Sequence, residues 1–292
     1  MNKLNTKGIY SALLTPYDGN GNVDYEELKK LVEFEKSNGV EGFYCCGSSG
    51  EGLLLEKEER MKIVETVSKE CGEIPFIVHT GALSTKLSLE LSLHAQENGA
   101  CAISMIPPIY YKYTVEEIAS HYLNVANKLD IGVIVYNIPQ FTGISLTTDD
   151  NFLQNKKIIG IKHTSMNLYE LERMIHLYPQ KTFFNGFDEI YLSSLSAGAT
   201  ATIGTTVNIC PKLIKGIRTD FENGNMEDAL NKQHLLNNLI ETLVNTSVFP
   251  GAKYCMELQG LKMGGCREPF APLSLEQKKE IQKALEKIQS FL

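Results

Sequence analysis

The sequence predicts an α/β protein, a (β/α)8 barrel of the TIM type with a C-terminal helical extension. Short apolar runs alternate with amphipathic stretches up to about residue 203, and eight such runs can be distinguished. The chain has 292 residues, and a barrel of this kind needs about 250. After about residue 224 only helical patterns remain. The main alternative is a doubly wound sheet, which does not require eight strand–helix units.

The eight apolar runs have the character of parallel strands. Nearly all of their residues are apolar, as expected where helices cover both faces of a sheet. We expect strands at residues 8–15, 42–46, 75–79, 101–106, 131–136, 158–162, 182–185 and 199–203.

Amphipathic stretches separate these strands. Their apolar residues recur at spacings of three and four, and each stretch opens near an acceptable N-cap. Thr114 precedes one of them, with Glu117 three residues later, which is the pattern of a capping box. We expect helices at residues 24–37, 57–69, 85–97, 115–127 and 168–177.

The last part of the chain is predicted to be helical at residues 226–246, 251–262 and 274–290. We therefore divide the chain into a barrel over residues 1–224, which contains the active site, and a helical extension over residues 225–292. No Pro/Ser-rich linker separates the two. The extension is therefore expected to pack against the barrel.

Composition excludes several classes of protein. The 28 Lys and Arg residues against 35 Asp and Glu residues give a net charge of −7, which argues against a nucleic-acid partner. No segment approaches the roughly 18 apolar residues of a membrane span, and residues 1–8 lack the apolar segment of a signal peptide. The seven cysteines show no CxxC spacing, which favours reduced thiols over a zinc site. We expect a soluble cytoplasmic protein with a small-molecule substrate.

Lys162 is the most informative single residue. It ends the predicted strand 158–162, whose other side chains are apolar or absent, and Gly160 on the same side of the strand leaves room beside it. A lysine that faces a barrel interior is costly unless it is neutral or paired. A neutral amine there is a nucleophile toward a carbonyl group and forms a Schiff base. The alternative is a lysine at the strand end that simply reaches water.

Two further features lie at the ends of other strands. Tyr136 ends strand 131–136, next to the strand of Lys162, and a phenol near an amine can move protons during imine formation and carbon–carbon cleavage. The loop Gly47-Ser-Ser-Gly-Glu51 follows the second strand, and its N–H groups and two hydroxyls can bind a carboxylate. Taken alone, such a tyrosine more often packs on a barrel rim, and Ser/Gly loops are common.

Five motifs lie at the ends of predicted strands, in chain order. They are Gly47-Ser-Ser-Gly-Glu51, Tyr136-Asn-Ile-Pro139, Gly160-Ile-Lys-His-Thr-Ser165, Asn185-Gly-Phe-Asp-Glu189 and Ile203-Gly-Thr-Thr-Val-Asn208. With these five motifs in this order, the chain resembles the N-acetylneuraminate lyase branch of the class I, Schiff-base aldolases, a family related to dihydrodipicolinate synthase. The resemblance extends from about residue 8 to residue 272.

The resemblance implies roles for the catalytic residues. Lys162 would attack the C2 keto group of the open-chain sialic acid and form the imine. Tyr136 would accept the proton of the C4 hydroxyl as the C3–C4 bond breaks. Ser48 and Ser49 would hold the substrate carboxylate, and Ser49 and Tyr110 would complete a hydroxyl relay with Tyr136. In relatives the tyrosine that matches Tyr110 lies close to a subunit contact.

The resemblance also implies a binding site for the sugar. Asp188 and Glu189 would bind the glycerol-like tail, because carboxylates accept hydrogen bonds from sugar hydroxyls. Gly186, Thr164 and Thr205 would contact the chain and the N-acetyl region. An acidic pair can also simply favour a helix N-terminus, and both interpretations can hold together.

The implied activity is reversible cleavage of N-acetylneuraminate to N-acetylmannosamine and pyruvate by a homotetramer, without metal or cofactor. Residues 139–143 contain no arginine, whereas dihydrodipicolinate synthases usually have one there to bind a second carboxylate. One alternative is another pyruvate-dependent aldolase or synthase, acting on a keto-deoxy sugar acid or resembling dihydrodipicolinate synthase. A second alternative is a catalytically silent sugar-binding barrel, although such a protein has no chemical need for Lys162 or Tyr136.

Overall fold

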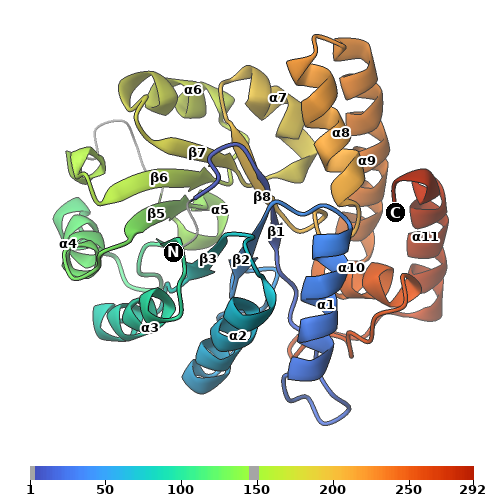
Figure 1. Cartoon of the computed structure of the whole chain (residues 1–292), viewed down its shortest axis with the longest axis horizontal. Coiled ribbons are helices and arrows are strands. Elements are labelled where there is room, and N and C mark those ends of the chain that lie inside the picture. Colours follow the sequence, from blue (N-terminus) through green and yellow to red (C-terminus); the bar gives the residue numbers. More distant parts are fainter. Residues whose placement is uncertain (1–3, 145–150) are drawn as a thin grey trace.

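The computed structural model describes residues 4–144 and 151–292, so the first three residues of the N-terminal stretch considered above lie outside it. Eight parallel strands close into a barrel in sequence order (Figure 1), which confirms the predicted fold class. The strands are β1 (Ile9–Ala12), β2 (Gly42–Cys45), β3 (Phe76–His79), β4 (Ala102–Met105), β5 (Gly132–Asn137), β6 (Ile158–His163), β7 (Thr182–Asn185) and β8 (Ala201–Gly204).

Helices follow the strands and surround the barrel (Figure 1). Those around the barrel are α1 (Tyr25–Ser37), α2 (Lys57–Glu70), α3 (Thr85–Glu97), α4 (Val115–Ala126), α5 (Pro139–Thr142), α6 (Leu168–Leu177), α7 (Tyr191–Ser196) and α8 (Pro211–Glu222), with short 3-10 turns η1 (Asn151–Gln154) and η2 (Asp188–Ile190). The capping box before α4 is present: Thr114 Oγ1 accepts from the Glu117 N–H at 3.2 Å, and Glu117 Oε2 accepts from the Thr114 N–H at 2.8 Å.

The interior of the barrel is filled by alternate residues of the strands. These interior side chains form their own buried cluster, which includes Tyr10, Ala12, Tyr44, Ile77, Ala102, Ile134, Tyr136, Phe184, Ala201 and Ile203. Lys162 lies in register with Tyr136 on β5 and with Phe184 on β7, so its side chain belongs to the same interior set. The strand register therefore places the amine and the phenol next to each other.

The chain continues into α9 (Met226–Thr246), α10 (Val248–Leu258), α11 (Leu275–Glu286) and the 3-10 turn η3 (Gln289–Phe291), which gather on one side of the barrel beside α8 (Figure 1). α10 starts three residues earlier than expected, because Pro250 lies in its first turn, where proline is tolerated. The boundary at residue 224 stays a prediction. No helix in residues 4–144 and 151–292 is long and apolar enough to cross a membrane.

Candidate active site

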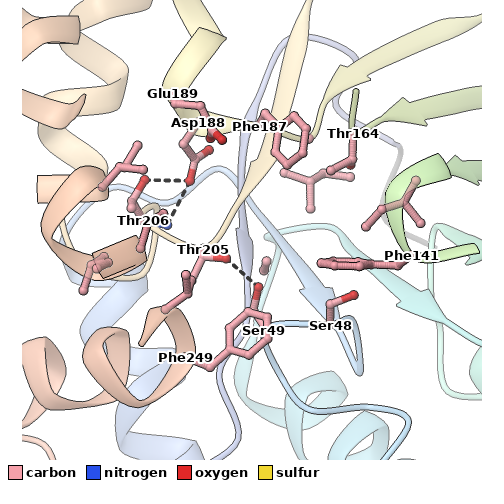
Figure 2. Close-up of a pocket in the computed structure, with 18 of the residues that line it drawn as sticks. Ser48, Ser49, Phe141, Thr164, Phe187, Asp188, Glu189, Thr205, Thr206 and Phe249 are labelled. Atoms are coloured by element: carbon pink, nitrogen blue, oxygen red, sulfur yellow. Dashed lines mark hydrogen bonds between the residues drawn. The ribbon is translucent and has the colours of Figure 1, made fainter. Parts of the chain in front are cut away.

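A cavity of about 390 Å³ opens at the C-terminal ends of the strands, where barrels of this type place their chemistry. Figure 2 shows side chains from the β2, β6, β7 and β8 loops converging on it. The structure brings every predicted site residue except Tyr110 to its lining: Ser48, Ser49, Tyr136, Lys162, Thr164, Gly186, Asp188, Glu189 and Thr205.

Lys162 lies at the floor of this cavity, with 4% of its surface exposed. Its Nζ lies 4.1 Å from the ring centroid of Tyr136 and 4.5 Å from that of Tyr44. Gly160 was expected to leave room beside Lys162, but the structure shows another reason for glycine at this position. A Cβ there would lie 2.6 Å from the Thr182 carbonyl oxygen. Glycine at this position therefore allows β7 to approach β6. The two rings leave the amine open chiefly toward the cavity, where a carbonyl carbon can reach it.

Neutral polar groups surround the two aromatic rings. The Tyr44 hydroxyl donates to Ser104 Oγ at 3.0 Å, and the ring of His79 lies edge-on to that of Tyr136 with centroids 5.9 Å apart. The Ile106 N–H donates to His79 Nε2 at 3.4 Å, so the imidazole proton lies on Nδ1. Burial, with the nearby positive charges, lowers the pKa of His79 to about 3. His79 is therefore neutral at physiological pH, beside the ring of Tyr136.

Ser48 and Ser49 lie in the loop Gly47–Glu51, which we call the carboxylate loop. Figure 2 shows Ser49 pointing across the cavity mouth toward Thr205, and their hydroxyl oxygens are 2.7 Å apart. The Glu51 N–H donates to the Ser48 carbonyl at 3.0 Å, which closes a tight turn around Ser49. The loop therefore brings Ser48 and Ser49 to the cavity that Lys162 also lines.

Gly52 directly follows this turn, and the close approach of the chain to Cys46 requires a glycine there. A Cβ on Gly52 would lie 1.9 Å from the Cys46 carbonyl oxygen, so only glycine fits. Cys46 and Glu51 both have φ of 57°, a left-handed conformation that is costly for residues with a side chain. The surrounding structure must therefore hold the loop in this shape.

The acidic pair lies opposite the carboxylate loop, at the start of η2. Asp188 Oδ2 accepts from the Thr206 N–H at 2.9 Å and from the Thr206 hydroxyl at 2.6 Å (Figure 2). Its Oδ1 is buried and has no hydrogen-bond partner among the described residues. Burial raises the pKa of both Asp188 and Glu189. An unpaired buried oxygen beside a cavity suits a ligand that donates a hydrogen bond, such as a hydroxyl.

Two glycines allow this arrangement. A Cβ on Gly204 would lie 1.8 Å from Asp188 Oδ1, and a Cβ on Gly186 would lie 1.8 Å from Thr164 Oγ1. Thr164 Oγ1 is also buried without a hydrogen-bond partner among the described residues. Two buried oxygens without a hydrogen-bond partner among the described residues, Asp188 Oδ1 and Thr164 Oγ1, therefore belong to residues that line the same cavity.

Sequence reasoning missed one wall of the cavity. Ile240, Leu243 and Val244 of α9, Val248 and Phe249 of α10, and Phe270 line it. The amphipathic period of residues 226–246 indicated an apolar face, but it did not indicate what that face covers. Thr206, which binds Asp188, was also missed, although it directly follows the predicted Thr205. The helical extension is therefore part of the site.

Tyr110 lies apart from the cavity of its own chain. It has φ of 83°, 88% of its surface is exposed, and its ring contacts that of Tyr111, which is 69% exposed. A second cavity of about 330 Å³ adjoins the first and is largely apolar, with Leu53, Ile109 and Phe141 among its lining residues. The predicted relay between Tyr110 and Tyr136 is therefore not formed within a single chain.

Comparison with known proteins supports the same family as the motifs. The profile of the dihydrodipicolinate synthetase family matches residues 5–288. The chain belongs to this family. It is 38% identical over 266 residues to an N-acetylneuraminate lyase of Rhizobium meliloti, covering 90% of this chain and 89% of that protein. It is 34% identical over 284 residues to an N-acetylneuraminate lyase of Clostridium perfringens, covering 95% and 99%.

Solved structures of the family agree. A Clostridium difficile protein, CdNal, determined in complex with mannosamine, superposes with a TM-score of 0.94 at 33% identity, covering 99% of this chain and 100% of that one. A catalytic lysine mutant of the Ruminococcus gnavus sialic acid aldolase gives a TM-score of 0.95 at 30% identity, with full coverage of both chains. The expected resemblance to the lyase branch is confirmed.

Proposed function

We propose that this chain is a Schiff-base aldolase that reversibly cleaves N-acetylneuraminate to N-acetylmannosamine and pyruvate. One observation supports this above all: a buried lysine lies beside a tyrosine at the floor of a cavity, between a loop suited to a carboxylate and an acidic pair suited to hydroxyls. The relatives named above as lyases and aldolases cover nearly the whole chain.

The proposed reaction starts at Lys162 Nζ. The amine adds to the C2 keto carbon to give a carbinolamine, and its hydroxyl group takes up a proton and leaves as water to give an iminium ion. The C3–C4 bond then breaks, and its electron pair moves through C3 toward the iminium nitrogen to form an enamine. Tyr136 takes the proton of the C4 hydroxyl, which becomes the aldehyde of N-acetylmannosamine. Protonation of the enamine at C3 and hydrolysis release pyruvate and the amine. The imine nitrogen accepts the electron pair, so the reaction needs no metal or cofactor.

The two sides of the cavity would bind opposite ends of the substrate. Ser48 and Ser49 would donate hydrogen bonds to the C1 carboxylate, which fixes C2 above the amine. Asp188 and Glu189 would accept hydrogen bonds from the glycerol-like tail. Burial raises the pKa of Asp188, and a substrate hydroxyl that donates to its unpaired Oδ1 would stabilise the carboxylate form.

Thr164, Gly186 and Thr205 lie between the two ends of the substrate. They line the cavity from the ends of β6, β7 and β8, where they would contact the sugar chain and the N-acetyl group. A side chain at position 186 would collide with the Thr164 hydroxyl, so glycine allows β6 and β7 to present both residues to the same part of the cavity.

We also propose a cytoplasmic homotetramer in which Tyr110 serves the site of a neighbouring subunit. Exposed apolar side chains support a subunit contact on this side of the chain: Leu53 and Phe141 line the second cavity, and Tyr110 and Tyr111 follow its lining residue Ile109. All seven cysteines are free thiols, which suits a reducing compartment. Mixing Lys162→Ala and Tyr110→Phe subunits tests the sharing: activity above that of either variant supports it, and no gain contradicts it.

The decisive experiment is borohydride trapping with N-acetylneuraminate, followed by peptide mapping, with product release measured in an unreduced sample. An adduct on Lys162 together with release of both products is expected. Lys162→Ala should remain folded and lose both adduct and turnover. An adduct from pyruvate with sialic acid uncleaved would contradict the proposed substrate and favour another acceptor. Absence of any adduct would contradict the aldolase mechanism.

A further inference from the structure

The carboxylate loop is tied to the C-terminal extension by a buried ion pair. Glu51 Oε1 accepts from Lys253 Nζ of α10 at 2.6 Å, and Glu51 Oε2 accepts from the Arg267 N–H at 2.7 Å. Glu51 is 3% exposed and Lys253 is 1% exposed. Lys253 also donates to the Gly265 carbonyl and lies 4.1 Å from the ring centroid of Tyr17. Both charged groups are thus fully enclosed and bonded.

Stability alone does not account for such a pair. Burying two charges costs free energy that their attraction only partly offsets, and apolar replacements of buried pairs are often neutral or stabilising. The cost is visible at Lys253, whose pKa is lowered by burial even though Glu51 acts in the opposite direction. A buried pair of this kind instead selects one geometry for the segments it joins.

Glu51 lies only three residues from Ser48, which is proposed to bind the substrate carboxylate. Glu51 has φ of 57°, and its N–H closes the turn by donating to the Ser48 carbonyl at 3.0 Å. A change in the backbone conformation of Glu51 therefore disturbs the hydrogen bond that closes the turn containing Ser48 and Ser49. Lys253 itself lines neither this turn nor the main cavity; it reaches the loop through the Glu51 carboxylate.

We infer that Lys253 is a positioning residue, which holds the carboxylate loop through Glu51 so that Ser48 and Ser49 face the C1 carboxylate of the substrate. This inference rests on the proposed function for the identity of the ligand. It adds that the C-terminal extension contributes, through Lys253 and Glu51, to binding the part of the substrate that becomes pyruvate.

The test is Lys253→Met, which removes the ammonium and keeps much of the side-chain volume. Amide exchange of residues 47–52, measured by mass spectrometry, is expected to accelerate. In the condensation direction the KM for pyruvate should rise about ten-fold, while the KM for N-acetylmannosamine stays unchanged. Lys181→Met is the matched control. Lys181 is also buried, but it donates to the Asn155 carbonyl near the opposite end of the barrel. It should change neither quantity.

Loss of one partner leaves the other charge buried, so Lys253→Met can unfold. The double variant Lys253→Met/Glu51→Gln lacks both charges of this pair, so it should fold. It should show the same faster amide exchange of residues 47–52 and the same raised KM for pyruvate. Wild-type loop exchange and pyruvate KM in the folded variant would overturn the inference. Amide exchange needs no turnover. Failure of the wild-type protein to trap pyruvate would therefore contradict the proposed function alone, and the exchange data would still decide the anchoring.

Discussion

Glu35 should make the stability of the protein fall as pH rises. The residue lies on α1 with 0% exposure, packed against the outer side of β1, and neither carboxyl oxygen has a hydrogen-bond partner among the described residues. Burial raises its pKa from 4.5 to about 8, although the Ser11 hydroxyl acts slightly in the opposite direction. The folded state therefore keeps a proton that the unfolded chain releases above pH 4.5.

Proton linkage gives the sign and the size of this pH dependence of stability. Between pH 4.5 and about 8 the unfolded state binds fewer protons, so the free energy of unfolding falls by about 1.4 kcal/mol per pH unit, or about 5 kcal/mol in all. Glu35→Gln removes this term. Its free energy of unfolding, relative to the wild type, should rise across that range and level off above it.

Urea denaturation of both proteins at pH 5, 6, 7 and 8 measures this difference, and other titrating groups cancel in it. Glu33→Gln on the same helix is the matched control, because the side chain of Glu33 is 67% exposed. A difference between Glu35→Gln and the wild type that does not vary with pH would refute the reasoning. Such a result would mean that the folded protein keeps Glu35 ionised.

Three further predictions concern the site. Gly52→Ala would place a methyl group 1.9 Å from a backbone carbonyl oxygen. It should lower the free energy of unfolding, measured by urea denaturation, by about 3 kcal/mol. An unfolding free energy equal to that of the wild type would contradict this. Asn237 Nδ2 donates to the Glu189 carbonyl at 3.0 Å, so Asn237→Leu should raise the KM for N-acetylmannosamine and leave that for pyruvate unchanged. Thr206→Val removes a hydrogen bond that lowers the pKa of Asp188. The acidic limb of the kcat/KM profile should therefore move to higher pH; an unmoved limb would show that Asp188 does not titrate there.

Elements with an unbroken local pattern were predictable from the sequence to the residue. The predicted helices 168–177 and 226–246 coincide with Leu168–Leu177 and Met226–Thr246, since their apolar period and flanking residues are local signals. α7 and α8 were not specified as individual helices. α7 has only six residues, too few to establish a helical period.

In the candidate site, residues placed by local sequence patterns were predictable, whereas contacts between residues far apart in the sequence were not. Lys162 and Tyr136 directly terminate apolar runs, so the strand pattern alone places them at one end of the barrel. The pairing of Glu51 with Lys253 joins residues 202 positions apart, and no local signal indicates it. The position of Tyr110 depends on the conformation of a loop, and sequence periodicity contains no information about that.

The position of the extension in the chain has a consequence for biosynthesis. All eight strands and Lys162 precede residue 205, whereas Lys253 and the apolar wall formed by α9 and α10 are translated later. A nascent polypeptide thus contains Lys162 before the helices that enclose the cavity around it. The ribosome must complete most of α10 before Glu51 can pair with Lys253. Termination before residue 248 would leave a barrel that contains Lys162 but lacks α10 and the cavity residues Val248, Phe249 and Phe270.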